Sequence, residues 1–235
     1  MARVDKVSLR NLNHDFQSFQ RKMLQQQSPA PAYVISQLSQ YEKKFKKLGL
    51  EHGYAGSLYT FANMMSKTGH KDIPGIIYSA LIKLPFLTPI TKEHYILKAL
   101  EYARSQGDEI HEHARLVDLK ILYKKTEQKN KYNEVLVQEE AVLKSICSNF
   151  KEAKQNFKTH SRGHSSIVKY KLELAKARVD IAKFTMKQEP QRAAYLLKKA
   201  IKTFTKHGKI KEAEFAGIML SEIEKRNTSR SFLEK

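Results

Sequence analysis

The feature that most constrains the fold is a run of apolar and small residues with helical spacing on both sides of a glycine. The run comprises Leu197, Ala200, Ile201, Phe204, Gly208, Ile210, Ala213, Gly217 and Leu220. Spacings of three and four residues place such side chains on one face of a helix. Glycine readily adopts the left-handed conformation that ends a helix. The run therefore predicts two short helices joined by a turn at Gly208, with small residues where the helices touch.

The first half of this pattern occurs twice more upstream. One copy comprises Leu58, Phe61, Ala62, Met65 and Gly69, and the other comprises Ile96, Ala99, Leu100, Ala103 and Gly107. Repeated helical hairpins stack into arrays in which each hairpin contacts its neighbours. We therefore predict an all-α fold, an array of about ten helices stacked as antiparallel hairpins in an α-solenoid.

Apolar spacing and helix-breaking residues divide the rest of the chain. The predicted helices are 8–27, 32–48, 54–67, 72–84, 91–106, 109–128, 129–160, 165–189, 191–207 and 210–227. Two prolines at 29 and 31 stop the first helix, and Gly53 is expected to end the segment of the second. Because no Gly/Ser linker separates two halves, we predict a single domain over 1–235. Residues 1–30 form its N-terminal helix and Pro-rich break, and 228–235 a frayed tail.

Positive charge is concentrated near the C-terminus. The chain has a net charge of +19, and residues 161–235 carry 18 Lys and Arg against 8 Asp and Glu. A basic surface attracts acidic protein, nucleic acid or anionic lipid. A candidate anion-binding face follows two helices with seven-residue spacing and comprises Lys169, Lys176, Lys183, Lys187, Arg192, Lys199 and Lys206. If the two stripes adjoin, they form a track for phosphates; otherwise they are solvated helix faces.

Residues 194–223 resemble a tetratricopeptide repeat (TPR). The family places a large residue, two small ones and an aromatic before a glycine turn, and small residues after it. Those places are held here by Leu197, Ala200, Ile201, Phe204, Gly208, Ala213 and Gly217. The resemblance implies a non-enzymatic adaptor that binds peptides on a concave face. It also implies that Tyr195, Lys198 and Lys202 face that groove. Lys202 stands where carboxylate-clamp members carry asparagine, which favours general attraction of acidic segments.

The sequence offers little that indicates catalysis. It has no phosphate-binding glycine loop, no nucleophile elbow and no metalloprotease motif, so we predict no enzymatic activity, catalytic residue, cofactor or metal site. Cys147 is the lone cysteine and excludes an intramolecular disulfide. Its place beside Ile146 on an apolar helix face indicates a buried, inert thiol. No apolar run reaches the length of a membrane span, and we expect a cytoplasmic protein.

Three interpretations remain open at this point. The favoured interpretation is an adaptor or scaffold that binds an acidic protein or peptide in a concave groove. The alternative is a protein associated with RNA through its basic C-terminal helices, which requires the two stripes to merge into one face. The third is an enzyme with an unfamiliar helical fold, which requires a closed pocket with convergent titratable groups.

Overall fold

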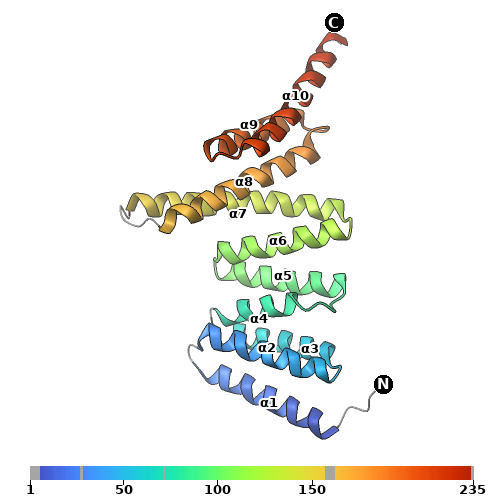
Figure 1. Ribbon diagram of the computed structural model, residues 1–235, viewed down its shortest axis with the longest axis vertical. Coiled ribbons are helices and arrows are strands. Elements are labelled where there is room, and N and C mark those ends of the chain that lie inside the picture. Colours follow the sequence, from blue (N-terminus) through green and yellow to red (C-terminus); the bar gives the residue numbers. More distant parts are fainter. Residues whose placement is uncertain (1–5, 27–28, 71, 157–161, 234–235) are drawn as a thin grey trace. The chain divides into compact units, whose positions relative to one another are not determined.

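A computed structural model describes residues 6–26, 29–70, 72–156 and 162–233 (Figure 1). All regular secondary structure in these residues is helical, which confirms the predicted all-α fold. The helices are α1 (Lys6–Gln25), α2 (Pro31–Lys47), α3 (Glu51–Lys67), α4 (Ile73–Ile82), α5 (Pro89–Ser105), α6 (Glu109–Lys125), α7 (Lys129–Asn156), α8 (Arg162–Thr185), α9 (Pro190–Lys206) and α10 (Ile210–Leu233). None of them is long and apolar enough to cross a membrane.

The chain divides into two compact units, Met1–His111 and Glu112–Lys235. In the N-terminal unit, α4 packs against α2, α3 and α5, while α1 packs against α2 and α3. In the C-terminal unit, α8 lies between α7 and α9, and α9 packs in turn against α10. Helices that follow one another in the sequence thus stack on one another within each unit. That the whole chain is a single domain stays a prediction.

The predicted helix bounds are close to those observed, with a clear error after α2. Gly53 was expected to end that segment, but it lies inside α3. The residue that ends α2 is Gly49, whose φ is +68°. At the other end of the chain, α10 continues to Leu233, beyond the end predicted at 227. Residues 157–161, where helix α7 was predicted to end, lie outside the described residues.

One turn geometry recurs at five helix ends. In each, the second residue after the helix has positive φ, and the next N–H donates to the carbonyl five residues earlier. This bond runs from Lys209 to Phe204 at 2.9 Å and from Gln128 to Tyr123 at 3.0 Å. It satisfies a carbonyl that the helix end leaves without an intrahelical partner. The residues with positive φ are Gly49, Gly69, Gly107, Glu127 and Gly208.

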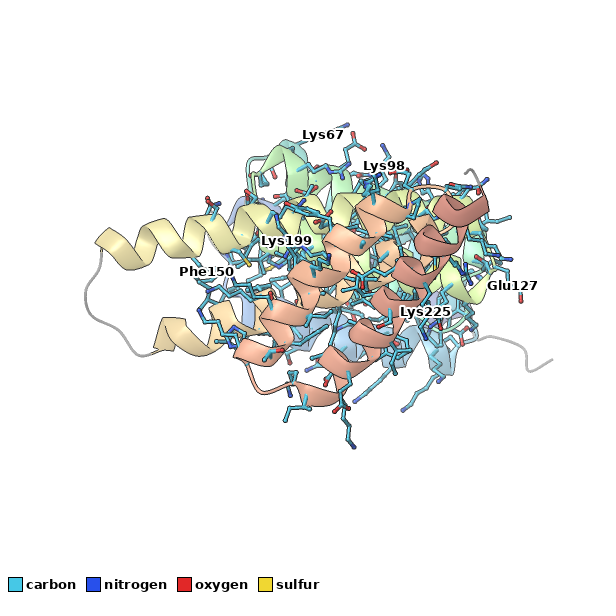
Figure 2. All side chains as sticks on the ribbon, turned by 90° about the horizontal axis from the view of Figure 1, so that it is seen from above. Lys67, Lys98, Glu127, Phe150, Lys199 and Lys225 are labelled. Carbon is cyan, nitrogen blue, oxygen red and sulfur yellow. The ribbon has the colours of Figure 1, made fainter. Side chains whose placement is uncertain are left out.

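We expect Glu127→Gly to raise the free energy of unfolding by about 1 kcal/mol, because a side chain in the left-handed region costs about that much. Glu127 is the non-glycine residue with positive φ in the described part of the chain, and it is exposed (Figure 2). Gly208→Ala is expected to have the opposite effect of similar size. Urea unfolding followed by circular dichroism measures both.

A helical glycine provides the control for this pair. Gly217 lies inside α10 without positive φ, and a Cβ added there meets nothing within 4 Å. Gly217→Ala should therefore leave stability unchanged or raise it, since alanine is the better helix former. If Gly208→Ala also left the free energy of unfolding unchanged, the left-handed conformation would not disfavour alanine, and the prediction would be wrong.

The core of the C-terminal unit confirms the first half of the repeat pattern and part of the second. Leu197, Ala200 and Phe204 of α9 are buried, with at most 2% of each residue exposed. On α10, the buried positions are Ala216, Met219 and Ile223. Ala213 and Leu220 of the predicted set are partly buried against the same core. A close helix crossing at Gly217 was wrong, because the space beside it is open.

A buried carboxylate joins α6 to α7. Glu139 is 2% exposed, and its Oε1 accepts a hydrogen bond of 2.6 Å from Lys120 Nζ. His113 Nε2 lies 3.5 Å from the same oxygen, and His113 is itself buried. Burial favours the neutral acid, but the approach of His113 and Lys120 outweighs it and holds the pKa of Glu139 below its ordinary value. This charged contact is thus a strong link between the two helices at neutral pH.

Candidate functional site

Tyr195 lies at the centre of a basic surface built from three helices of the C-terminal unit. Tyr195 is 56% exposed on α9, and the Nζ of Lys199 lies 4.3 Å from its ring centroid. Figure 2 labels Lys199. A hydrogen bond with Lys199, together with the charges of Lys199, Arg178 and Lys144, holds the pKa of Tyr195 below its ordinary value. We call this surface, formed by Lys144, Arg178, Tyr195 and Lys199, the tyrosine face.

A buried carboxylate fixes two cations of the tyrosine face. Glu140 of α7 is 6% exposed, and its Oε1 lies 2.8 Å from Lys144 Nζ and 3.3 Å from Arg178 Nε. The Arg178 side chain is only 12% exposed, so its position is set by packing and by this ion pair. Lys144 keeps 53% of its side chain exposed. The tyrosine face therefore places the cations of Arg178 and Lys144, which are fixed by Glu140, beside an accessible aromatic ring.

The predicted groove residues separate in the structure. Tyr195, Lys198 and Lys202 are all exposed on α9. Tyr195 turns toward α7 and α8, as its neighbours Lys144 and Arg178 show. Lys198 instead reaches α10, where its Nζ lies 3.3 Å from Glu224 Oε1. Of the three predicted groove residues, only Tyr195 belongs to the tyrosine face.

The two basic stripes are both exposed but lie on different sides of α8. All seven residues predicted for the anion-binding face are exposed. Lys183 Nζ lies 5.0 Å from the ring centroid of Phe215, which places the first stripe toward α10. Arg178 follows Lys176 by two residues, which is about 200° around the helix, and lies near Tyr195 and Lys199 of the second stripe. These contacts place Lys183 and Lys199 toward different neighbours, which does not favour one continuous track.

A hollow opens beside the first stripe, between α8, α9 and α10. Its volume is about 270 Å³. We call it the lysine hollow; its lining residues are Lys176, Val179, Asp180, Lys183, Phe204, Lys211, Glu212 and Phe215. Val179 and Phe204 are buried core residues, whereas Phe215 is 49% exposed. The hollow thus combines an apolar interior with lysine ammonium groups at its edge.

Several residues of these two surfaces were not predicted from the sequence. Glu140 and Lys144 have the i, i+4 spacing of a helical ion pair, a signal that was present in the sequence. Phe215 lies off the apolar stripe of its helix, which also indicated an exposed aromatic ring. Arg178 could not be assigned in this way, because its contact with Glu140 spans 38 residues.

The cysteine and the histidines considered as candidates for catalysis or metal binding lie in ordinary structural surroundings. Cys147 is half-buried against Leu143 and Leu174, and burial raises the pKa of its thiol. A raised pKa keeps a thiol protonated and poorly nucleophilic. His111 interacts with Asp108 at the start of α6. Among the residues whose positions are described, no three His, Cys, Asp or Glu side chains are grouped to hold a metal ion.

Comparison with known proteins yields distant structural likenesses. No family model matches the chain, and no curated protein matches its sequence. BtubC (BKLC) from P. vanneervenii aligns with 86% of this chain and 93% of its own, at 10% identity and a TM-score of 0.32. A circular tandem repeat protein with novel repeat topology aligns with 82% of this chain and 45% of its own, at 14% identity and a TM-score of 0.25. These likenesses are too distant to bear on function.

Proposed function

We propose that the chain is a TPR-like adaptor of the cytoplasm that binds an acidic polypeptide segment on the tyrosine face, without catalysing a reaction. The observation that carries the proposal is the exposed ring of Tyr195, which has Lys199 Nζ 4.3 Å from its centroid and also feels the charges of Arg178 and Lys144. Carboxylates of a bound segment would pair with Lys199, and with Lys144 in addition to its ion pair with Glu140; both lysines reach solvent. The ring would supply apolar contact area at a low cost in conformational entropy.

The arrangement of charge favours an acidic polypeptide over RNA. A phosphate track needs cations that follow one another along a continuous surface. Here Lys183 of the first stripe points toward α10, whereas the tyrosine face is a small cluster in which Lys199 lies over one ring and Glu140 pairs with Lys144 and Arg178. A few spaced carboxylates match such a cluster better than a long run of phosphates does.

The proposal is tested by titrating the full chain against a fluorescein-labelled 15-residue peptide rich in Glu and Gly, and following fluorescence anisotropy. Lys199→Glu is expected to weaken binding about tenfold, which is about 1.4 kcal/mol, because it removes a cation and adds a repelling charge. Tyr195→Ala should weaken binding by a smaller factor through loss of the ring.

Lys187→Glu is the matched control, because it makes the same charge change at an exposed residue of the other stripe. It should alter affinity by less than about threefold through long-range attraction alone. If Lys187→Glu and Lys199→Glu weaken binding equally, the tyrosine face has no special role and the proposal fails.

A further inference from the structure

The lysine hollow has the size of a pocket for one or two side chains. Its volume of about 270 Å³ is below the range of about 300–1,000 Å³ that is usual for whole small-molecule ligands. Val179 is 6% exposed and Phe204 is 2% exposed, so the floor is held in place by the core of the unit. Phe215 forms a wall from α10 and keeps 49% of its surface exposed. The interior is therefore rigid, apolar and open to a ligand.

The edge of the hollow is positively charged. Lys176 and Lys211 form no ion pair within the residues that the structure describes. Lys183 is held in place, because its Nζ lies 3.5 Å from Asp180 Oδ1 and 5.0 Å from the ring centroid of Phe215. The lining residues thus carry three ammonium groups and two carboxylates, those of Asp180 and Glu212. Asp180 is paired with Lys183. Ligands that complement this edge carry negative charge beside an apolar group.

We propose that the lysine hollow is a second docking site, which takes an acidic peptide segment with one apolar anchor, Leu or Phe, flanked by Asp or Glu. The anchor enters between Phe204 and Phe215, and the flanking carboxylates pair with Lys176 and Lys211. Burial of the anchor and of the exposed ring of Phe215 drives binding, while the lysines set the preference for acidic flanks.

This site is separate from the tyrosine face. Its residues on α8 include Lys176, which points about 200° around the helix from Arg178 of the tyrosine face. The tyrosine face is also different in chemistry, because it offers an exposed ring on a flat cluster of cations rather than an apolar interior. The hollow therefore selects for the anchor residue, a property that the tyrosine face does not explain.

The test uses two labelled peptides that share the same Asp and Glu residues and differ only at the central position, Leu in one and Ser in the other. Anisotropy titrations with the full chain at about 150 mM salt give the two dissociation constants. We expect the Leu peptide to bind about tenfold more tightly, the effect of burying one leucine side chain. Equal affinity for the two peptides would overturn the proposal.

Two variants locate the preference on the chain. Phe215→Ser removes the exposed wall and should abolish the difference between the Leu and Ser peptides. Ile210→Ser is the matched control, because Ile210 is 65% exposed at the start of α10 and does not line the hollow. It should preserve the difference. If Phe215→Ser also preserves it, the anchor binds elsewhere and the hollow is not the site.

The variant Tyr195→Ala distinguishes binding in the lysine hollow from binding on the tyrosine face. This variant should leave the preference for Leu over Ser intact, even where it weakens the binding of both peptides. A preference that disappears in Tyr195→Ala and survives in Phe215→Ser would assign the anchor to the tyrosine face and contradict the separate site.

Discussion

Phe204→Ala is expected to lower the free energy of unfolding by about 3–5 kcal/mol, the usual cost of removing a buried phenylalanine ring. Phe204 is 2% exposed, belongs to the core shared by α8, α9 and α10, and forms the floor of the lysine hollow. Its removal enlarges that hollow into the core, where neighbouring helices can collapse only in part. Urea unfolding followed by circular dichroism measures the change.

Phe215→Ala makes the same chemical change at a ring that is 49% exposed on the adjoining helix. It should cost about 1 kcal/mol or less, because about half of the Phe215 surface is in water already in the folded chain. Equal losses for the two variants would mean that the α9–α10 hairpin is not packed as the structure shows.

The second large effect is expected at Glu139. Glu139→Gln keeps the size of the side chain but leaves Lys120 without its carboxylate and His113 with only Glu173, 3.7 Å away. Breaking a buried ion pair from one side costs about 3–5 kcal/mol, and we expect about 3 kcal/mol here because the Lys120 side chain is 22% exposed. Glu134→Gln on the same helix is the control; Glu134 is exposed, so its change should be within about 0.5 kcal/mol.

The effect of Glu139→Gln should depend on pH. The pKa of Glu139 in the folded chain is held below its ordinary value of 4.5, so its carboxylate stabilises the fold at pH values above that value. This contribution is lost as the pH falls through the lowered pKa. The difference in stability between the parent chain and Glu139→Gln should therefore be full at pH 7 and shrink below about pH 4.5. A difference that stays constant to pH 3 would exclude the carboxylate as its cause.

Local spacing was sufficient to predict the helices, because helix formation depends on neighbours three and four residues apart. Gly69, Gly107 and Gly208 end helices as expected, each with positive φ. The choice between Gly49 and Gly53 was missed, since both glycines flank the same short segment and only one of them needs the left-handed conformation. Glu127 was missed for a related reason: the turn it forms has the usual geometry without the usual residue.

Contacts between distant helices were harder to predict. The periodicity of α10 predicts Ala213, Gly217 and Leu220 on the packed face; Ala213 and Leu220 do pack against the core, but packing buries Ala216, Met219 and Ile223 more completely. The two basic stripes each follow one helix, but whether they merge depends on how α8 is rotated between its neighbours. Lys198 illustrates the same limit, because its partner Glu224 lies 26 positions away.

The most direct test of the proposed adaptor is a competition between an acidic peptide and RNA. The full chain is bound to the labelled Glu-rich peptide at about 150 mM salt, and unlabelled single-stranded RNA of equal total charge is added. At this ionic strength charges separated by more than about 8 Å are largely screened, so direct contacts with the tyrosine face rather than net charge should decide the outcome. We expect RNA to displace the peptide only at a large excess. The concentration of RNA that displaces the labelled peptide is compared with the concentration of unlabelled peptide that does so. If RNA is effective at an equal or lower concentration, the proposal is contradicted and a protein that associates with RNA is favoured.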